Sequence, residues 1–177
     1  MLKKLSKISE TKVSWVLLLA GSSILLFLSL YFQHVLKLEP CILCIYQRIA
    51  IMGIIIASLV GLLSNYKNKI IRNVSYFIWI LSSSFGLWAA LSQWRETYIA
   101  KTTPFYMSQC GQGLERFIPS LEHYKILSDL FIAKGICSEI TWRFLGLAMH
   151  NYLSLIFGLF LICGILFLTA NLKNNDE

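Results

Sequence analysis

Long uncharged apolar runs are the feature of this sequence that most restricts its fold. Four such runs alternate with polar, charged segments, and the longest extends over residues 144–172. The hydrocarbon core of a bilayer is ~30 Å thick, so an α-helix rising ~1.5 Å per residue crosses it in about 20 residues. Each run reaches that length, the second only if it begins near Cys41 and includes Arg48. The sequence therefore predicts an all-α membrane protein, a bundle of four transmembrane helices at about 14–32, 43–64, 73–93 and 145–170.

A single membrane domain, residues 1–177, is expected, because no internal repeat, low-complexity tract or linker divides the chain. With 56% hydrophobic and 14% charged residues, the composition argues against a soluble protein. The long polar segment at about 94–144 is too short and too polar to bury a core of its own. The first 32 residues also resemble a signal peptide, but the apolar run is long and no small-x-small cleavage site follows it. A retained first helix is therefore favoured.

Basic residues are distributed unequally between the two sides of the predicted bundle. The net charge is +7, and one side collects Lys3, Lys4, Lys7, Lys12, Lys67, Lys69, Arg72 and Lys173. Cytoplasmic loops of membrane proteins carry the excess of lysine and arginine. Both termini and the 65–72 loop are therefore expected in the cytoplasm, with segments 33–41 and about 94–144 facing outward. The same distribution argues against nucleic-acid binding.

The long outward segment contains one stretch with the pattern of a short amphipathic helix. Ser120 is suited to cap a helix that runs to about Lys134, and Gly135 is suited to end it. The apolar residues on one face are Leu121, Tyr124, Leu127, Leu130 and Phe131. Such a helix either lies on the membrane surface or packs against the outer ends of the transmembrane helices, and both arrangements fit. Aromatic residues expected to anchor the outer interface are Tyr31, Tyr46, Trp94, Tyr98 and Trp142.

Cys41 and Cys44 form a CxxC motif at the expected start of the second helix, where they should be exposed on the outward side. Pro40 suits the first turn of a helix, which sets Cys41 at the helix N-terminus, where partial positive charge favours a thiolate. Arg48 follows Cys44 by one helical turn, about 6 Å along the axis, and also favours a thiolate there. An arginine at membrane depth is costly, so Arg48 is a candidate functional residue. The alternative is that it snorkels to the headgroups without a redox role.

Cys110 and Cys137 lie in the long outward segment, exposed to the same compartment. In an oxidising compartment they are expected to pair, either as a redox-active disulfide or as an inert clip on the loop. Two cysteine pairs that face one compartment can pass two electrons by thiol–disulfide exchange. A zinc site is disfavoured, because the second pair lacks CxxC spacing and an oxidising compartment competes for the thiolates. Cys163, in the middle of the fourth run, is expected to be a buried thiol that packs as a small apolar residue.

The residues around these cysteines resemble the DsbB family, quinone reductases of the bacterial inner membrane in the disulfide-forming pathway. The likeness is carried by QHVLKLEPCILCIYQR at 33–48, Pro104–Phe105 ahead of Cys110, AKGICSE around Cys137 and WRFLGLAM at 142–149. With four spans in matching order, it covers nearly the whole chain. The resemblance implies a four-helix bundle and a thiol:quinone oxidoreductase that reoxidises the periplasmic oxidant DsbA.

The resemblance also implies roles for individual residues. The thiolate of reduced DsbA would attack the Cys110–Cys137 disulfide at Cys110. Cys137 would pass the electrons to Cys41 and Cys44 through a transient Cys41–Cys137 bond. Cys44 would then donate to a membrane quinone, ubiquinone or menaquinone, held beside Arg48. All four cysteines would face the periplasm.

The sequence departs from the family pattern near the outer end of the third span. Some members carry a histidine and a glutamine there that are associated with the quinone, whereas this chain has QWRET at 93–97, without histidine. Gln93 and Arg95 are candidates to replace them. His34 could reach the rim of the quinone site, although a surface histidine without a role is the simpler interpretation. The competing function is a non-catalytic membrane scaffold with a disulfide-clipped outer loop.

Overall fold

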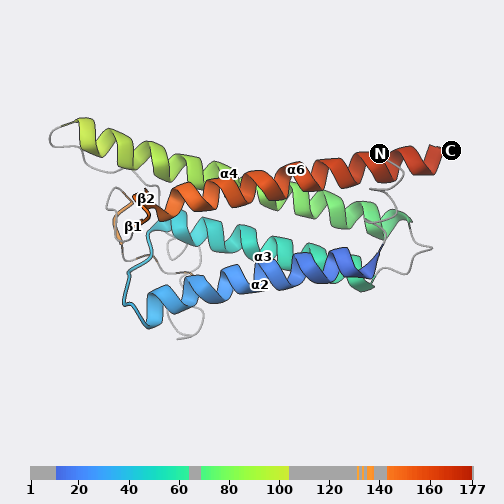
Figure 1. Ribbon diagram of the computed structural model, residues 1–177, viewed down its shortest axis with the longest axis horizontal. Helices are drawn as coiled ribbons and strands as arrows, with labels where there is room; N and C mark the ends of the chain where they lie inside the picture. The colour runs from blue at the N-terminus through green and yellow to red at the C-terminus, as the bar shows by residue number, and fades with distance from the viewer. Residues whose placement is uncertain are drawn as a thin grey trace.

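Long helices make up most of the described structure. The computed structural model describes residues 11–63, 69–103, 131, 133, 135–137 and 143–176. Its helices are α2 (Lys12–His34), α3 (Ile42–Leu63), α4 (Lys69–Thr102) and α6 (Met149–Asp176), which lie alongside one another in a bundle (Figure 1). All four are long and apolar enough to cross a membrane. The predicted four-helix membrane fold is confirmed, and the chain is a multi-pass membrane protein.

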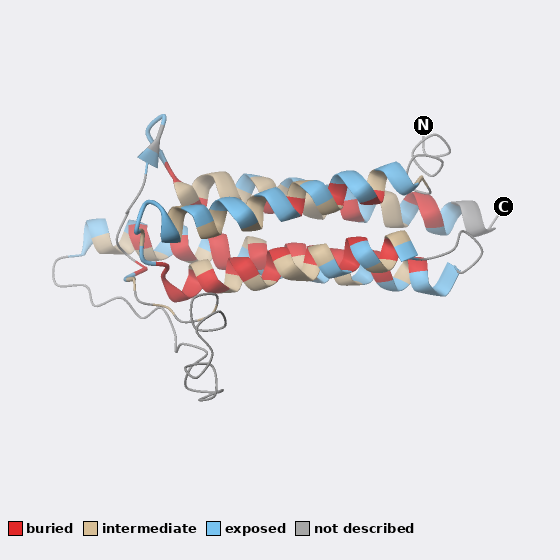
Figure 2. Ribbon diagram, turned by 90° about the horizontal axis from the view of Figure 1, so that it is seen from below, coloured by how far each residue is buried: buried red, intermediate tan, exposed pale blue. Residues whose placement is uncertain are grey.

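The helices pack in the order α2–α3–α4–α6, with α2 and α6 at the two edges of the row. α3 is the most buried helix, whereas α2 and α6 expose much of their apolar surface (Figure 2). Leu17, Phe27 and Leu159 are among the large exposed apolar side chains. Lipid tails are as apolar as these side chains, so the exposure carries little cost in a bilayer.

Aromatic rings fill the core on one side of the bundle's midpoint. Trp15 of α2 packs on Tyr76 and Trp79 of α4, with ring centroids 5.1 Å and 6.1 Å apart, and Trp79 packs edge-on against Phe167 of α6 at 6.0 Å. A Cβ on Gly61 of α3 would come within 2.5 Å of the Trp15 ring. The absence of a side chain at Gly61 therefore lets α2 approach α3 closely.

The two ends of the bundle carry different structures. One end, where α2 begins and α6 ends, is named the inner end after the predicted orientation; there the Asn171 side chain donates a 2.8 Å hydrogen bond to Asn73 Oδ1, which ties α6 to α4. The opposite end, named the outer end in the same way, is where α3 begins, α4 ends and a small β-hairpin precedes α6 (Figure 1). The CxxC motif lies at the outer end.

α4 is longer than the membrane requires. It has 34 residues, or about 51 Å at the rise of an α-helix, against a hydrocarbon core of ~30 Å. The predicted span ends at about residue 93 because apolar character is lost there, but the helix continues to Thr102. It ends just before Pro104, which disfavours helical conformation in the residue that precedes it. The segment predicted as a loop from about residue 94 therefore begins as a helix.

A two-stranded hairpin takes the place of the first residues of the predicted fourth span. β1 (Arg143–Phe144) pairs with antiparallel β2 (Leu147–Ala148). In the turn between them Leu145 has φ 49° and Gly146 has φ 82°, the two positive values of a type I′ turn. The predicted helix starts at about residue 145, but the observed one begins at Met149. Apolar composition alone does not distinguish the hairpin from the helix that follows it.

Part of the long outward segment lies outside the described residues. This part includes Cys110, Trp142 and all of the predicted amphipathic helix at 120–134 except Phe131 and Ala133. That helix, and its location on the membrane or against the bundle, stays a prediction.

Candidate functional site

Cys41 and Cys44 are brought together at the start of α3. Both are free thiols, and their sulfur atoms lie 2.8 Å apart. The backbone N–H of Cys44 also donates to Cys41 Sγ at 3.4 Å. Cys41 is only 3% exposed, so the prediction that it would be exposed is wrong. Cys44 is half-buried, so neighbouring residues shield much of the pair from solvent.

The surroundings of Cys41 favour the protonated form of its thiol. The pKa of Cys41 is raised, first because its thiol hydrogen-bonds to the Cys44 side chain and next because burial disfavours a thiolate. The prediction that a helix N-terminus would favour a thiolate at Cys41 is therefore wrong. The helix begins one residue later, at Ile42, and the neighbouring sulfur and the burial outweigh its partial charge.

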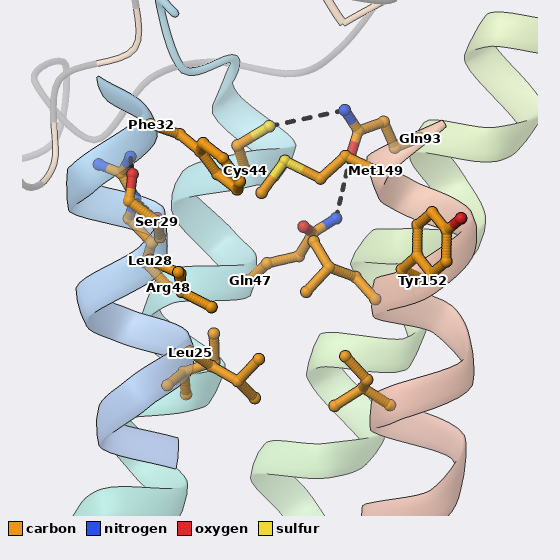
Figure 3. A pocket seen from close by; sticks show the side chains of 13 residues that line it. Leu25, Leu28, Ser29, Phe32, Cys44, Gln47, Arg48, Gln93, Met149 and Tyr152 are labelled. Atoms are coloured by element: carbon orange, nitrogen blue, oxygen red, sulfur yellow. Dashed lines mark hydrogen bonds between the residues drawn. The ribbon is translucent and has the colours of Figure 1, made fainter. Parts of the chain in front are cut away.

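Two glutamines form a chain of hydrogen bonds that leads from the thiols to a buried residue of α3. Gln93 of α4 donates from Nε2 to both Cys41 Sγ and Cys44 Sγ, at 3.5 Å each. Gln47 of α3 donates to Gln93 Oε1 at 3.0 Å, and both glutamines are buried. Figure 3 shows this chain of contacts from Cys44 through Gln93 to Gln47. A buried amide that is oriented by a second amide can stabilise negative charge on either sulfur.

Arg48 is held inside the bundle by α2. Its Nε donates to Ser29 Oγ at 2.6 Å, its Nη1 to Gln33 Oε1 at 2.6 Å, and its Nη2 to the Ser29 carbonyl oxygen at 3.3 Å. Arg48 is 4% exposed, so it does not snorkel to the headgroups. These bonds offset the cost of a buried guanidinium and fix the position of its positive charge.

A cavity of about 360 Å³ lies beside these groups. Cys44, Gln47, Arg48 and Gln93 line it, while most of its wall is apolar and comes from α2, α3 and α6 (Figure 3). The apolar lining residues are Leu25, Leu28, Phe32, Ile51, Met149, Leu153 and Ile156. Figure 3 shows α2 and α6, the two edges of the helix row, on opposite sides of the cavity. The cavity is thus a mostly apolar pocket with polar groups gathered near Cys44, as in typical sites for small organic ligands.

The segment that contains Cys137 is docked on the residues just before α3. Gly135 N–H donates to the Pro40 carbonyl oxygen at 3.0 Å, and a Cβ at Gly135 would collide with the Glu39 carbonyl oxygen. Cys137 is fully buried and packs in one apolar cluster with Cys41. It is disulfide-bonded, and the other half of that bond lies outside the described residues. Docking therefore buries Cys137, which was predicted to be exposed, and brings an oxidised cysteine to the reduced CxxC pair.

The other candidates are distributed as follows. Gln93, Arg95 and His34 were the further candidates for the quinone site. Gln93 lines the cavity, whereas Arg95 and His34 are exposed on the outer part of the bundle and do not line it. Cys163 is exposed on α6 rather than buried as predicted. It is away from the site and faces the lipid side of its helix.

Sequence reasoning missed the polar partners of the site. Ser29, Gln33 and Gln47 were not singled out, and Gln93 was only a candidate. The sequence does show that these polar side chains lie within apolar spans. Burying a polar side chain in a membrane costs free energy unless a neighbouring helix supplies a hydrogen-bond partner. Which helix that would be depends on the packing of α2, α3 and α4.

A vicinal thiol pair beside an apolar membrane pocket, with a second, oxidised cysteine docked against it, defines a membrane-embedded thiol–disulfide oxidoreductase. The family profile described as "Disulfide bond formation protein DsbB" matches residues 11–167. The chain belongs to this DsbB family and is a disulfide-forming oxidoreductase.

Similar proteins cover the chain almost from end to end. "Disulfide bond formation protein B" of Psychromonas ingrahamii is 35% identical over 174 residues, which are 98% of this chain and 91% of that protein. The protein of the same name from Vibrio cholerae is 34% identical over 180 residues, covering 99% and 98%. That of Idiomarina loihiensis is 36% identical over 153 residues, covering 86% and 82%. These relatives support the enzyme over the non-catalytic scaffold.

Proposed function

We propose that this chain transfers electrons from a periplasmic DsbA-like thiol oxidoreductase to a quinone in the bacterial inner membrane. Both termini are cytoplasmic in this proposal, and the reactive cysteines are periplasmic. The observation that carries it is the docking of Gly135 on Pro40, which holds the oxidised Cys137 in one cluster with Cys41. Transfer between two cysteine pairs requires such contact, because exchange proceeds by direct attack of sulfur on sulfur.

The first step is proposed to occur in the outer loop. The donor's thiolate attacks Cys110 of a Cys110–Cys137 disulfide, forms a mixed disulfide and releases the Cys137 thiolate. Cys137 then attacks Cys41 of an oxidised Cys41–Cys44 pair, which forms a Cys41–Cys137 bond and releases the Cys44 thiolate. The donor's second thiol resolves the mixed disulfide, and the donor leaves oxidised while Cys110 becomes a thiolate.

The second step restores the loop disulfide. Cys110 attacks Cys137, which re-forms Cys110–Cys137 and releases Cys41, which takes up a proton. The net change is two electrons moved from the donor to the Cys41–Cys44 pair.

The cavity beside Cys44 fits a quinone. Its apolar wall suits an isoprenoid chain, and its polar groups gather at one part near the sulfur. When bound, a quinone supplies a lipid-soluble acceptor for two electrons and two protons. Cys44 lines the cavity and is the proposed electron donor, and the fixed charge of Arg48 stabilises negative charge that develops in its vicinity. The Cys41 and Cys44 sulfur atoms share a hydrogen bond, and Gln93 donates to both of them.

The proposal is tested with purified protein, a reduced DsbA-type donor and a soluble ubiquinone or menaquinone analogue. Oxidation of the donor should require the quinone, and Cys44→Ser should abolish it because the proposed electron donor is gone. Cys163→Ser is the matched control, since this thiol lies exposed on α6, and its rate should equal that of the unaltered protein. Turnover that persists in Cys44→Ser would refute the scheme.

The donor itself can be identified by covalent trapping. With Cys137→Ser, Cys110 stays a thiol, and its thiolate attacks the disulfide of the oxidised donor to form a mixed disulfide. Acid quench and alkylation capture this complex before the donor's second thiol resolves it. Mass spectrometry of the complex from membranes should find a periplasmic thiol oxidoreductase attached at Cys110. Attachment at Cys41 instead would show that the donor reacts directly with the CxxC motif and not with Cys110 and Cys137, the loop pair.

A further inference from the structure

A second, smaller pocket lies on the outer part of the molecule, away from the thiols. It has a volume of about 120 Å³ and is formed by the end of α4, the β-hairpin and the start of α6. A single water needs roughly 10–15 Å³ of such space, so the pocket has room for a polar group of several heavy atoms. It has no residue in common with the cavity at Cys44.

The pocket is polar and positively charged. Lys101 of α4 and Arg143 of β1 line it, and none of the described lining residues is acidic. His150 also lines it, and the residue is only 5% exposed. A buried imidazole beside two cations can offer a hydrogen bond to an anionic ligand that enters the pocket.

The long α4 carries one side of the pocket beyond residue 93, where the third membrane span is predicted to end. Trp94, Thr97, Tyr98 and Lys101 share one helical face, because their spacing is three, four and seven residues. Lys101 lies eight residues, or about 12 Å along the axis, beyond Gln93. Trp94 and Tyr98 are exposed and stack at 6.1 Å between ring centroids, as expected for aromatic residues at the headgroup level.

The hairpin supplies the opposite side. Arg143 pairs with Ala148 across the two strands, which sets Arg143 next to the first turn of α6 and His150. The type I′ turn that makes this pairing possible requires the positive φ of Gly146. The hairpin thus positions the Arg143 guanidinium at the pocket, and the second cation, Lys101, comes from α4.

We propose that this pocket binds a phosphate group, with Lys101 and Arg143 as its cationic ligands and His150 as a further hydrogen-bonding partner. Arginine and lysine are the side chains that bind phosphate oxygens most strongly. Phosphate is the abundant anion at the headgroup level, where it belongs to phospholipids, and anionic phosphatidylglycerol is the lipid form with the best charge complementarity. Bound lipid would hold the hairpin against α4.

The test uses the full-length protein in an uncharged detergent. Short-chain phosphatidylglycerol is titrated, and bound lipid is counted by native mass spectrometry, with phosphatidylcholine of equal chain length for comparison. One saturable phosphatidylglycerol site is expected. Lys101→Gln together with Arg143→Gln should weaken it about tenfold or more, because two charge-assisted contacts are lost. Each single substitution should give a smaller loss, and thermal unfolding checks that the variants are folded.

Arg95→Gln is the matched control, because Arg95 is an exposed cation on the same outer part of α4 and does not line the pocket. It should leave the lipid affinity unchanged. Competition by inorganic phosphate would assign the site to free phosphate, whereas no displacement at millimolar phosphate would assign it to the lipid headgroup. Equal phosphatidylglycerol binding in the double variant, or an equal loss in Arg95→Gln, would overturn the proposal.

Discussion

Each end of the bundle contains a hydrogen bond between two side-chain amides, part-buried at the inner end and buried at the outer end. At the inner end Asn171 donates to Asn73, 2.8 Å away, behind a core of packed aromatic rings. At the outer end Gln47 donates to Gln93 at 3.0 Å, and Gln93 continues to the two sulfurs of the CxxC pair. One amide pair ties helices together, while the other also orients reactive groups beside a cavity.

The two halves of the bundle differ in how side chains fill the space between the helices. In the inner half, ring-to-ring contacts fill the space between α2, α4 and α6. In the outer half, the cavity of about 360 Å³ separates α2 from α6, and Cys44 and Arg48 line it. The inner half also has a buried arginine, Arg72, and a pocket of about 420 Å³ between α4 and α6, but that pocket is lined by Asn73 and apolar residues and contains no thiol. Buried polar groups and a cavity both lower the free energy of unfolding. The packed aromatic core of the inner half therefore supplies much of the stability that keeps the outer site folded. Substitutions at the two ends should therefore have separable effects on activity and stability.

Among substitutions that keep all four reactive cysteines, removing the Arg48 guanidinium should give the largest effect on turnover. Arg48→Leu is expected to lower kcat/KM for the quinone by roughly 10²-fold, by analogy with removal of a donor that stabilises developing negative charge. Exchange between the loop pair and the CxxC pair should remain, since Arg48 bonds to Ser29 and Gln33 rather than to the loop. Stopped-flow quinone absorbance measures the first effect and thiol trapping the second.

Arg95→Leu is the control for that substitution, because Arg95 is exposed and does not line the cavity. Its quinone kinetics should match those of the unaltered protein. Unchanged kinetics in Arg48→Leu would contradict the role assigned to Arg48.

A side chain at Gly135 should slow transfer between the two cysteine pairs. In Gly135→Ala the new Cβ would collide with the Glu39 carbonyl oxygen, a backbone atom that moves less easily than a side chain. We expect about tenfold slower reduction of the CxxC pair by a reduced donor, measured by rapid acid quench and alkylation. Reduction of quinone by dithiothreitol acting directly on Cys41 and Cys44 should be unaffected.

Gly158→Ala provides the comparison, because a Cβ at Gly158 of α6 meets no atom within 4 Å. Its transfer rate should not change. If Gly135→Ala also transferred electrons at the normal rate, docking of this segment would not limit the exchange.

The two amide pairs can be compared directly. Gln93→Leu removes the donor to both sulfurs and should lower the quinone reduction rate several-fold. Asn73→Leu should lower the free energy of unfolding by about 1 kcal/mol, the size of an interhelical hydrogen bond in membrane proteins, without changing the rate. Steady-state rates and thermal unfolding are measured for both variants. A slower enzyme in Asn73→Leu would mean that the two ends are not separable.

The smallest expected effect concerns the proton on Cys41. Its pKa is raised chiefly by the Cys44 side chain, so Cys44→Ala should move that pKa down toward the ordinary thiol value. Thiolate then forms at lower pH, and alkylation of Cys41, followed by peptide mass spectrometry, should begin at lower pH than in the unaltered protein. A pH profile shifted upward would show that the Cys44 side chain does not raise the pKa of Cys41.

The fold was predictable because apolar run length directly reflects the thickness of a bilayer. Apolar run length does not locate the ends of the helices. The third membrane span is predicted to end at about residue 93, and α4 continues beyond it to Thr102. Residues 145–148, predicted to be helical, belong to a turn and β2. Helix ends follow local backbone requirements, in this chain Pro104 and the positive φ of Leu145 and Gly146, rather than apolar character.

The reactive residues of the candidate site were predictable from the sequence, but the residues that pack against them and hydrogen-bond to them were not. The CxxC spacing, the second pair and an arginine at membrane depth identify Cys41, Cys44, Cys137 and Arg48 from residue type alone. Burial of Cys41 and Cys137 arises from contact between segments almost 100 residues apart, which no local pattern contains. The hydrogen bonds of Arg48 likewise depend on which face of α2 meets α3.

The most direct test of the proposed relay is the bond between the two cysteine pairs. In the double variant Cys44→Ser and Cys110→Ser, the thiols left at the outer end are Cys41 and Cys137. Mild oxidation of the purified protein should join them in nearly every molecule, seen as one cross-linked peptide pair under non-reducing conditions. If both remained thiols, or if Cys137 formed bonds only between molecules, the loop would not deliver electrons to the CxxC pair and the proposed relay would be wrong.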